Sequence, residues 1–191
     1  MTLRIGFVTG ATPDKWARNW RSMSSTPLEL IPLAAADQER AVREGSVDMA
    51  LVRLPIDTDD LHCVRLYEEL PVVVASREHF LAAADDEVST SDLADEQLVI
   101  PSAAGWVPHA EQLPWPAMDA KDAVETVAAG TGIAILPMSV ARLHQRKDVV
   151  ARVVGDLPPT QIALVWLKDR DDETTQQFVG VVKGRTARSS R

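Results

Sequence analysis

The turn TGATPDK, residues 9–15, is the first place in the sequence where residue types favour binding of a small anion. It contains a glycine and precedes a predicted helix, so its backbone N–H groups and the helix dipole can hold negative charge. The turn lacks the lysine and Ser/Thr spacing of a P-loop, and it has no G-x-G-x-x-G pattern. An ordinary strand-to-helix turn is therefore the alternative to a ligand contact at Thr9, Gly10, Ala11 and Thr12.

Arg53 ends the apolar run VDMALVR and is the second candidate. A guanidinium at the carboxyl end of a parallel strand is well placed to pair with a ligand carboxylate. A surface salt bridge with one of the many nearby acids, such as Asp57 or Asp59, is the competing interpretation. The sequence leaves both open.

The stretch AAGTGIAILP, residues 128–137, is the third candidate for a ligand contact. Gly130 suits the left-handed position that ends a helix, and Gly132 permits close packing into the next strand. We predict that both glycines are mainly architectural. The hydroxyl of Thr131 between them is a secondary candidate for a ligand contact.

Signatures of catalysis and of metal binding are missing from the sequence. The four histidines are scattered without metal-ligand spacing, and the single cysteine, Cys63, has no partner motif. There is no G-x-S-x-G or H-E-x-x-H pattern. We predict no catalytic residue, no metal and no cofactor, and hence a protein that is not an enzyme.

The composition predicts a soluble globular protein. Its 191 residues suffice for one large domain or two small lobes, with 46% hydrophobic and 25% charged residues. A net charge of -8 opposes attraction to nucleic acid or anionic membranes. One cysteine excludes an internal disulfide, and we find neither a signal peptide nor a stretch long enough to span a membrane. We expect a cytoplasmic protein.

The first third of the chain alternates strands and helices. We predict strands at 3–8, 28–33 and 47–55, a helix with Thr12 as N-cap and Pro13 as first residue, and a helix at 36–45. This order is typical of a parallel sheet with helices on its faces.

The pattern in the rest of the chain predicts a second α/β lobe. We expect strands at 70–76, 97–101, 133–137, 149–154 and 161–167, helices at 120–129 (capped by Asp119), 139–146 and 172–184, and a loop at 102–119. The strands near 71–76 and 161–167 can carry the chain out of one lobe and back, leaving a cleft of the kind in which α/β proteins bind ligands. The expected lobes are 1–74 with 163–184, and 75–162, followed by a basic disordered tail at 185–191.

Five motifs resemble a known family. LRIGFV, EGSVDMALVR, LPVVVASREHFLA, SDLADEQLVIP and VETVAAGTGIAILPMSVA occur in the order found in the effector-binding domain of LysR-type transcriptional regulators, up to about Gly180. The resemblance implies an α/β protein with the type 2 periplasmic-binding-protein fold, in which two Rossmann-like lobes are joined by two crossover strands. It also implies a small, often carboxylate-bearing effector in the cleft, and a homodimer that pairs the first lobe of one subunit with the second lobe of its mate.

Carried over by motif, the effector contacts are Thr9 to Thr12, Ala34 to Ala36 (with Ala35 between them), Arg53, Pro101 and Ser102, with Thr131 nearby. The chain departs from the family in having AAA where many relatives have serine or threonine, and in a short, proline-rich segment after Ser102. It also begins directly before the first effector-domain strand, without a winged helix-turn-helix. A chain complete at Met1 is expected to have no sequence-specific DNA binding of its own.

The leading hypothesis is a small-molecule effector-binding protein that modulates transcription through a partner or a lost DNA-binding segment. It predicts a polar or carboxylate ligand, a homodimer and no membrane partner. Alternatives are a solute-binding protein, against which the missing signal argues, and a dehydratase-like enzyme, which needs a buried carboxylate with a shifted pKa. A further alternative is an interaction module whose cleft is filled by its own side chains.

Overall fold

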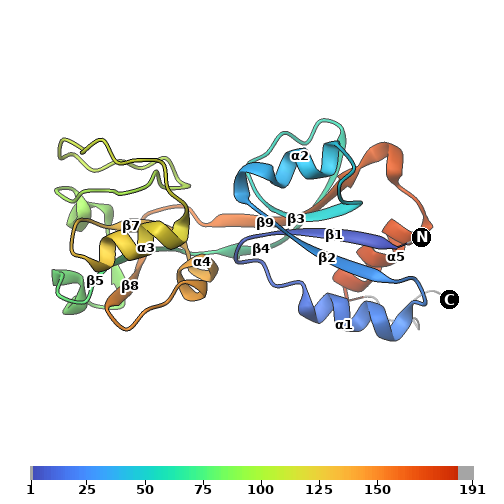
Figure 1. The fold of residues 1–191 in the computed structure, drawn as a ribbon, viewed down its shortest axis with the longest axis horizontal. Helices are drawn as coiled ribbons and strands as arrows, with labels where there is room; N and C mark the ends of the chain where they lie inside the picture. Colours follow the sequence, from blue (N-terminus) through green and yellow to red (C-terminus); the bar gives the residue numbers. More distant parts are fainter. Residues whose placement is uncertain (1, 185–191) are drawn as a thin grey trace. The chain divides into compact units, whose positions relative to one another are not determined.

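The computed structural model describes residues 2–184, and the chain divides into two compact units. Unit 1 comprises the chain up to Tyr67 and from Gln161 onward, and unit 2 is Glu68–Thr160 (Figure 1). The first boundary lies earlier than the predicted residue 74, because strand β5 (Pro71–Ser76) pairs wholly within the sheet of unit 2. The predicted basic tail, residues 185–191, lies outside the described residues.

Unit 1 contains a five-stranded sheet in the order β2-β1-β3-β9-β4. Its strands are β1 (Leu3–Val8), β2 (Leu28–Leu33), β3 (Met49–Arg53), β4 (Leu61–Glu69) and β9 (Thr160–Leu167). β1 is parallel to both β2 and β3, which confirms the predicted parallel arrangement, and β9 is antiparallel to β3. β4, an edge strand whose half-buried and exposed side chains alternate, was not among the predicted strands.

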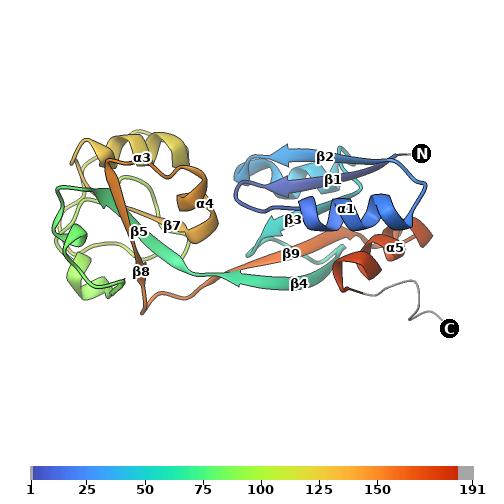
Figure 2. The same cartoon turned by 90° about the horizontal axis from the view of Figure 1, so that it is seen from below.

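The helices of unit 1 cover both faces of this sheet. They are α1 (Asp14–Met23), the 3-10 turn η1 (Ala35–Asp37), α2 (Gln38–Arg43), the 3-10 turn η4 (Lys168–Arg170) and α5 (Glu173–Val182). Side chains alternate across β3, so Met49 and Leu51 pack with α1 and α5, whereas Ala50 and Val52 pack with α2. Figures 1 and 2 show α1 and α5 together and α2 across the sheet from them.

Trp20 forms the centre of the core between α1 and α5. Its side chain is fully buried, its ring meets Phe178 edge-on at 5.6 Å, and its Nε1–H donates to the Thr26 carbonyl at 2.8 Å. Trp16, four residues earlier, is half-buried against the same cluster. Both tryptophans of α1 therefore pack within unit 1.

The start of α1 differs from the prediction by one residue. The N-cap is Pro13 and not Thr12, and no side chain caps the helix. The Ala11 N–H donates to the Val8 carbonyl in a tight turn, and the Pro13 carbonyl accepts from Ala17, so the helix begins just beyond the exposed Thr12.

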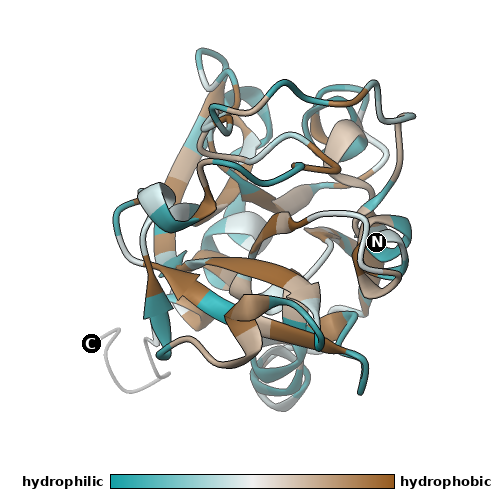
Figure 3. Ribbon diagram, turned by 90° about the vertical axis from the view of Figure 1, so that its left-hand side faces the viewer, coloured by the Kyte–Doolittle hydropathy of each residue, from teal (hydrophilic) through white to brown (hydrophobic). Residues whose placement is uncertain are grey.

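Unit 2 has a four-stranded sheet in the order β6-β8-β5-β7. Its elements are β5, the 3-10 turns η2 (Phe80–Ala82) and η3 (Thr90–Leu93), β6 (Glu87–Val88), α3 (Ala120–Ala128), β7 (Ala134–Pro137), α4 (Met138–Leu143) and β8 (Val149–Val154). β5 is antiparallel to β7 and β8, and β6 is parallel to β8. The strands are mainly hydrophobic in Figure 3, as expected for a sheet that is buried on both faces.

The predicted strand 97–101 is wrong, because only one parallel bridge, Leu98 with Ile133, forms there. Two backbone bonds accompany this bridge, from Val99 N to the Ile133 carbonyl at 3.0 Å and from Ile133 N to the Gln97 carbonyl at 2.7 Å, and glutamine side chains make further bonds there. Gln112 Oε1 accepts from Leu98 N at 2.7 Å, while Gln97 accepts from Leu113 N and donates to the Glu111 carbonyl, both at 2.9 Å. These two amides hold the irregular segment 102–119 to the sheet.

Among residues 2–184, no helix is long and apolar enough to cross a membrane.

Candidate ligand-binding site

The carboxyl ends of the three parallel strands of unit 1 lie at one edge of its sheet. Val8 pairs with Leu33, and Phe7 pairs with Leu51, so the segments that follow β1, β2 and β3 emerge side by side. Open α/β sheets bind their ligands at this edge. The topology therefore gathers Thr9 to Thr12, Ala34 to Ala36 and Arg53, which the sequence had proposed separately.

Arg53 is the polar centre of this edge. Its Nη2 donates to the Thr9 carbonyl at 3.2 Å, which aims the half-buried guanidinium at the turn after β1. Asp57, one of the acids named as an example of a salt-bridge partner, pairs with Arg43 at 3.4 Å. The guanidinium thus connects the ends of two neighbouring strands.

Gln38 is a residue of this edge that the sequence reasoning missed. Its side-chain Nε2 donates to the Arg53 carbonyl at 2.9 Å, and its Oε1 accepts from the Arg53 N–H at 2.8 Å. Only its place directly after the AAAD segment, at the start of a predicted helix, marked it in the sequence.

The turn after β1 presents backbone and the hydroxyl-bearing side chains of Thr9 and Thr12. Gly10 has a φ of +91°, a conformation that favours glycine. Thr12 is exposed, and Thr9 and Gly10 are half-buried. Ala11 is buried in the core of unit 1, so its methyl group serves packing, and only its backbone can contact a ligand.

The turn after β2 offers backbone alone. Ala34, Ala35 and Ala36 are exposed, and the Ala34 carbonyl accepts from Asp37 N at 3.0 Å. Their methyl groups carry no hydrogen-bonding atom. Any polar contact from this segment must come from N–H or C=O groups.

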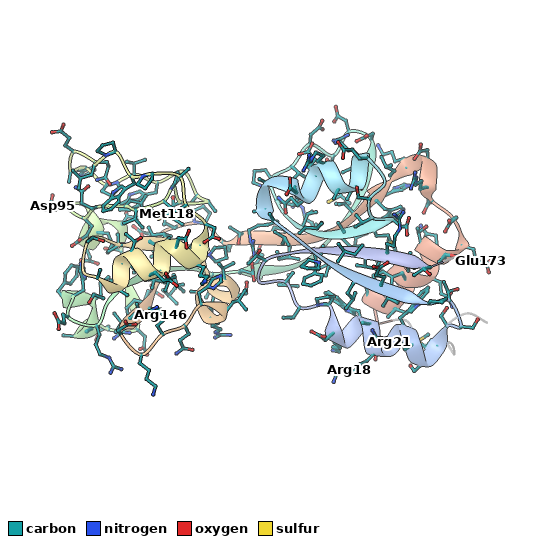
Figure 4. All side chains as sticks on the ribbon, in the orientation of Figure 1. Arg18, Arg21, Asp95, Met118, Arg146 and Glu173 are labelled. Atoms are coloured by element: carbon teal, nitrogen blue, oxygen red, sulfur yellow. The ribbon has the colours of Figure 1, made fainter. Side chains whose placement is uncertain are left out.

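In unit 2, Pro101 and Ser102 are adjacent but differ in exposure. Pro101 is exposed and borders a largely apolar cavity of about 570 Å³ formed by residues 98–118, including Met118, which Figure 4 labels. Ser102 is buried, and its hydroxyl donates to the Trp106 carbonyl at 3.0 Å. Its oxygen can still accept a hydrogen bond.

The structure separates Thr131 from Ser102. The bridge between Leu98 and Ile133 is parallel, so Thr131 lies before it and Ser102 beyond it, on opposite sides. The Thr131 hydroxyl donates to the Thr126 carbonyl at 2.8 Å and so satisfies the end of α3. The expectation that Thr131 lies near Pro101 and Ser102 is corrected by this register.

The two flanking glycines have the architectural role predicted for them. Gly130 has a φ of +79° where α3 ends. At Gly132, a Cβ atom would lie 2.4 Å from the Gln97 carbonyl oxygen, and φ is +157°. No larger residue fits between these two chain segments without displacing one of them.

We also looked among the described residues for a metal site and for a nucleophilic cysteine. No group of three or more His, Cys, Asp or Glu side chains within residues 2–184 is arranged to hold a metal ion. Partial burial raises the pKa of the Cys63 thiol, with Arg65 opposing that shift. A raised pKa keeps the thiol protonated near neutral pH, whereas a nucleophilic cysteine needs a lowered one.

Comparison with known proteins assigns this chain to a family. The sequence profile of the LysR substrate binding domain matches residues 2–187. The chain belongs to this family. The match confirms the resemblance drawn from the five motifs, and LysR domains are the effector-binding part of regulators that respond to small molecules.

Curated relatives of this LysR domain are transcriptional regulators. The Hca operon transcriptional activator HcaR of Escherichia coli is 24% identical over 202 residues, covering 97% of this chain and 68% of that protein. The regulator CatR of Pseudomonas putida is 29% identical over 148 residues, covering 69% of this chain and 49% of that protein. The chain thus spans between about half and two thirds of the length of these two relatives.

Solved structures confirm the fold class. The effector-binding domain of BenM with its effector benzoate superposes with a TM-score of 0.75 at 21% identity, covering 98% of this chain and 93% of that one. Full-length CbnR complexed with its target DNA gives 0.73 at 16% identity, covering 96% of this chain and 70% of that one. The fold is therefore the two-part α/β fold of type 2 periplasmic-binding proteins, as predicted.

Proposed function

We propose that this LysR domain binds a small carboxylate effector through Arg53 and the turns after β1 and β2. The observation that carries the proposal is the hydrogen bond from Arg53 Nη2 to the Thr9 carbonyl at 3.2 Å, at the carboxyl edge of three parallel strands. For unit 2, taken by itself, we propose ligand contacts at Pro101, which borders the apolar cavity of that unit, and at the adjacent Ser102. Thr131 is not part of this proposal, because its register places it away from Ser102.

The chemistry of the guanidinium favours a carboxylate. Arginine carries five N–H donors in a planar fork that matches the two oxygens of a carboxylate. The exposed alanines after β2 add no side-chain hydroxyl, so Arg53 is the only charged side chain among the residues proposed here. BenM, which shares this fold, has been solved with benzoate, itself a carboxylate.

A titration with benzoate and its neutral analogue benzamide tests the proposal. A ligand that binds only the folded state raises the melting temperature as its concentration rises. We expect such a rise with benzoate, or with another member of a panel of small aromatic and aliphatic carboxylates, and none with the matching amides. A melting temperature that stays constant across the panel would contradict the proposal and favour the interaction module.

The proposed cellular role is regulation of transcription in the cytoplasm, by effector occupancy that shifts the population of a second conformation. HcaR and CatR are named as transcriptional regulators, and CbnR has been solved with its target DNA. We infer that sequence-specific DNA contacts come from a separate DNA-binding segment or a partner, because residues 2–187 match the effector-binding domain alone.

We further propose a homodimer in which α1 of one subunit faces α3 of the other. Lys15, Arg18 and Arg21 are exposed on α1, where Figure 4 labels the two arginines. Asp122 and Glu125 are exposed on α3 and lie one helical turn apart. Opposite charges on two helices of the same chain suit an interface in which each subunit contributes one of them.

Charge reversal tests this interface. We expect the double variant Arg18→Glu and Arg21→Glu to sediment as a monomer, and the double variant Asp122→Arg and Glu125→Arg to do the same. An equimolar mixture of the two should restore a dimer, because each contributes the complementary helix. Reversal of the exposed Asp95 is the control and should leave the dimer intact. Dimers in both double variants, or no dimer in the mixture, would contradict the assignment.

A further inference from the structure

We infer that Gln38 is the positioning residue of the effector site, because its amide holds the segment from which the Arg53 side chain projects. The inference rests on the proposed function for its consequence in binding. Both side-chain hydrogen bonds of Gln38 are made with the backbone of Arg53, so Gln38 acts on a ligand only through Arg53.

The amide of Gln38 makes two hydrogen bonds in opposite directions. It donates to the Arg53 carbonyl at 2.9 Å and accepts from the Arg53 N–H at 2.8 Å. Among side chains of this length, only a primary amide has both a donor and an acceptor. Gln38 is 9% exposed, so water cannot easily replace these bonds.

The need for this amide follows from the register of the sheet. Pairing between β1 and β3 ends at Phe7 with Leu51, two residues before Arg53. On the other side, the Leu54 N–H donates to the Gln161 carbonyl, so the N–H and C=O of Arg53 point to the side where β1 has already ended. Gln38 thus takes the place of a β-strand neighbour for the last residue of β3.

This arrangement connects all three segments of the proposed site. Ala34 to Ala36 lead directly into Gln38 through η1, Gln38 binds the backbone of Arg53, and Arg53 Nη2 donates to the Thr9 carbonyl. A guanidinium whose backbone is fixed loses less conformational freedom when a ligand binds. Gln38 therefore prepares Arg53 for the ligand without touching the ligand.

The test replaces Gln38 by methionine, which has similar length but no amide. The probe is sodium acetate, titrated into the ¹⁵N-labelled full chain at constant ionic strength, with the Arg53 Nε–H followed by NMR. We expect Gln38→Met to lower the order parameter of this group and to weaken acetate binding on the order of two- to tenfold. Gln145→Met, an exposed glutamine in unit 2, is the matched control and should change neither.

The two readouts separate this inference from the proposed function. If acetate does not bind the wild-type chain but the Arg53 order parameter still falls in Gln38→Met, the positioning role stands and the ligand assignment fails. An unchanged order parameter in a folded variant would overturn the inference. Should Gln38→Met not fold, Gln38→Glu retains the acceptor for Arg53 N and loses the donor, and an Arg53 as rigid as in the wild type would overturn it equally.

Discussion

Replacement of Arg53 by glutamine is expected to weaken carboxylate binding by about 10- to 100-fold. A hydrogen bond to a charged group contributes about 1.5–3 kcal/mol, and each 1.4 kcal/mol corresponds to a factor of ten in affinity. The loss should be confined to carboxylates, because the neutral amide analogues never use the guanidinium charge. Isothermal titration calorimetry of the wild-type and variant chains measures both affinities.

Arg53→Lys is the informative companion variant, because it keeps the charge and loses the planar fork. We expect an affinity between those of the wild type and Arg53→Gln. Arg65→Gln, on the exposed part of β4, is the control for a general change in surface charge. Affinity that is unchanged in Arg53→Gln would remove this residue from the site.

Replacement of Trp20 by alanine is expected to destabilise unit 1 by about 3–5 kcal/mol, the range observed when a large aromatic residue is removed from a core. Trp20 is fully buried, packs edge-on against Phe178 and donates to the Thr26 carbonyl. Its loss leaves a cavity and an unpaired carbonyl together. Trp16→Ala, a half-buried position of the same helix, should cost less.

Hydrogen exchange of backbone amides measures this effect unit by unit, which is needed because two compact units need not unfold together. We expect amides of α1, α5 and β3 to lose protection in Trp20→Ala, while those of β5 and β8 in unit 2 keep theirs. Equal loss of protection in both units would show that Trp20 does not act through the core of unit 1 alone.

Periodicity and turn residues predicted most of the helices and strands, because each reflects a local preference. The run LPVVVAS became β5, and Asp119 caps α3 through a bond from Asp122 N. Where pairing decides the outcome, local pattern failed. Residues 97–101 look like a strand, yet their backbone pairs only around Ile133, and the Leu98 N–H donates to the Gln112 side chain. Strand β4 has exposed polar positions but pairs at the edge of its sheet.

The part of the candidate site that depends on the order of strands and helices was predictable, and the part that depends on strand pairing was not. The order of strands and helices was enough to bring the turn after β1 and the end of β3 to one edge, and Arg53 contacts Thr9 as that order implies. Gln38 could not be found, because its partner Arg53 is fifteen residues away and the contact depends on where β1 stops. The misplacement of Thr131 has the same origin, since only the direction of the Leu98 bridge fixes it.

The attachment of segment 102–119 has a consequence for how this domain can diversify. Its anchoring bonds come from the amides of Gln97 and Gln112 and from His109 N and Ala110 N, which donate to the Ala94 carbonyl. The strands of the unit 2 sheet pair with one another without it. Exchanges at the exposed residues 103–105, which lie outside these bonds and outside the strands, are therefore expected to leave the sheet register intact. Because Pro101 and its apolar cavity border this segment, new binding preferences can arise there by loop variation while the folding of the domain is preserved.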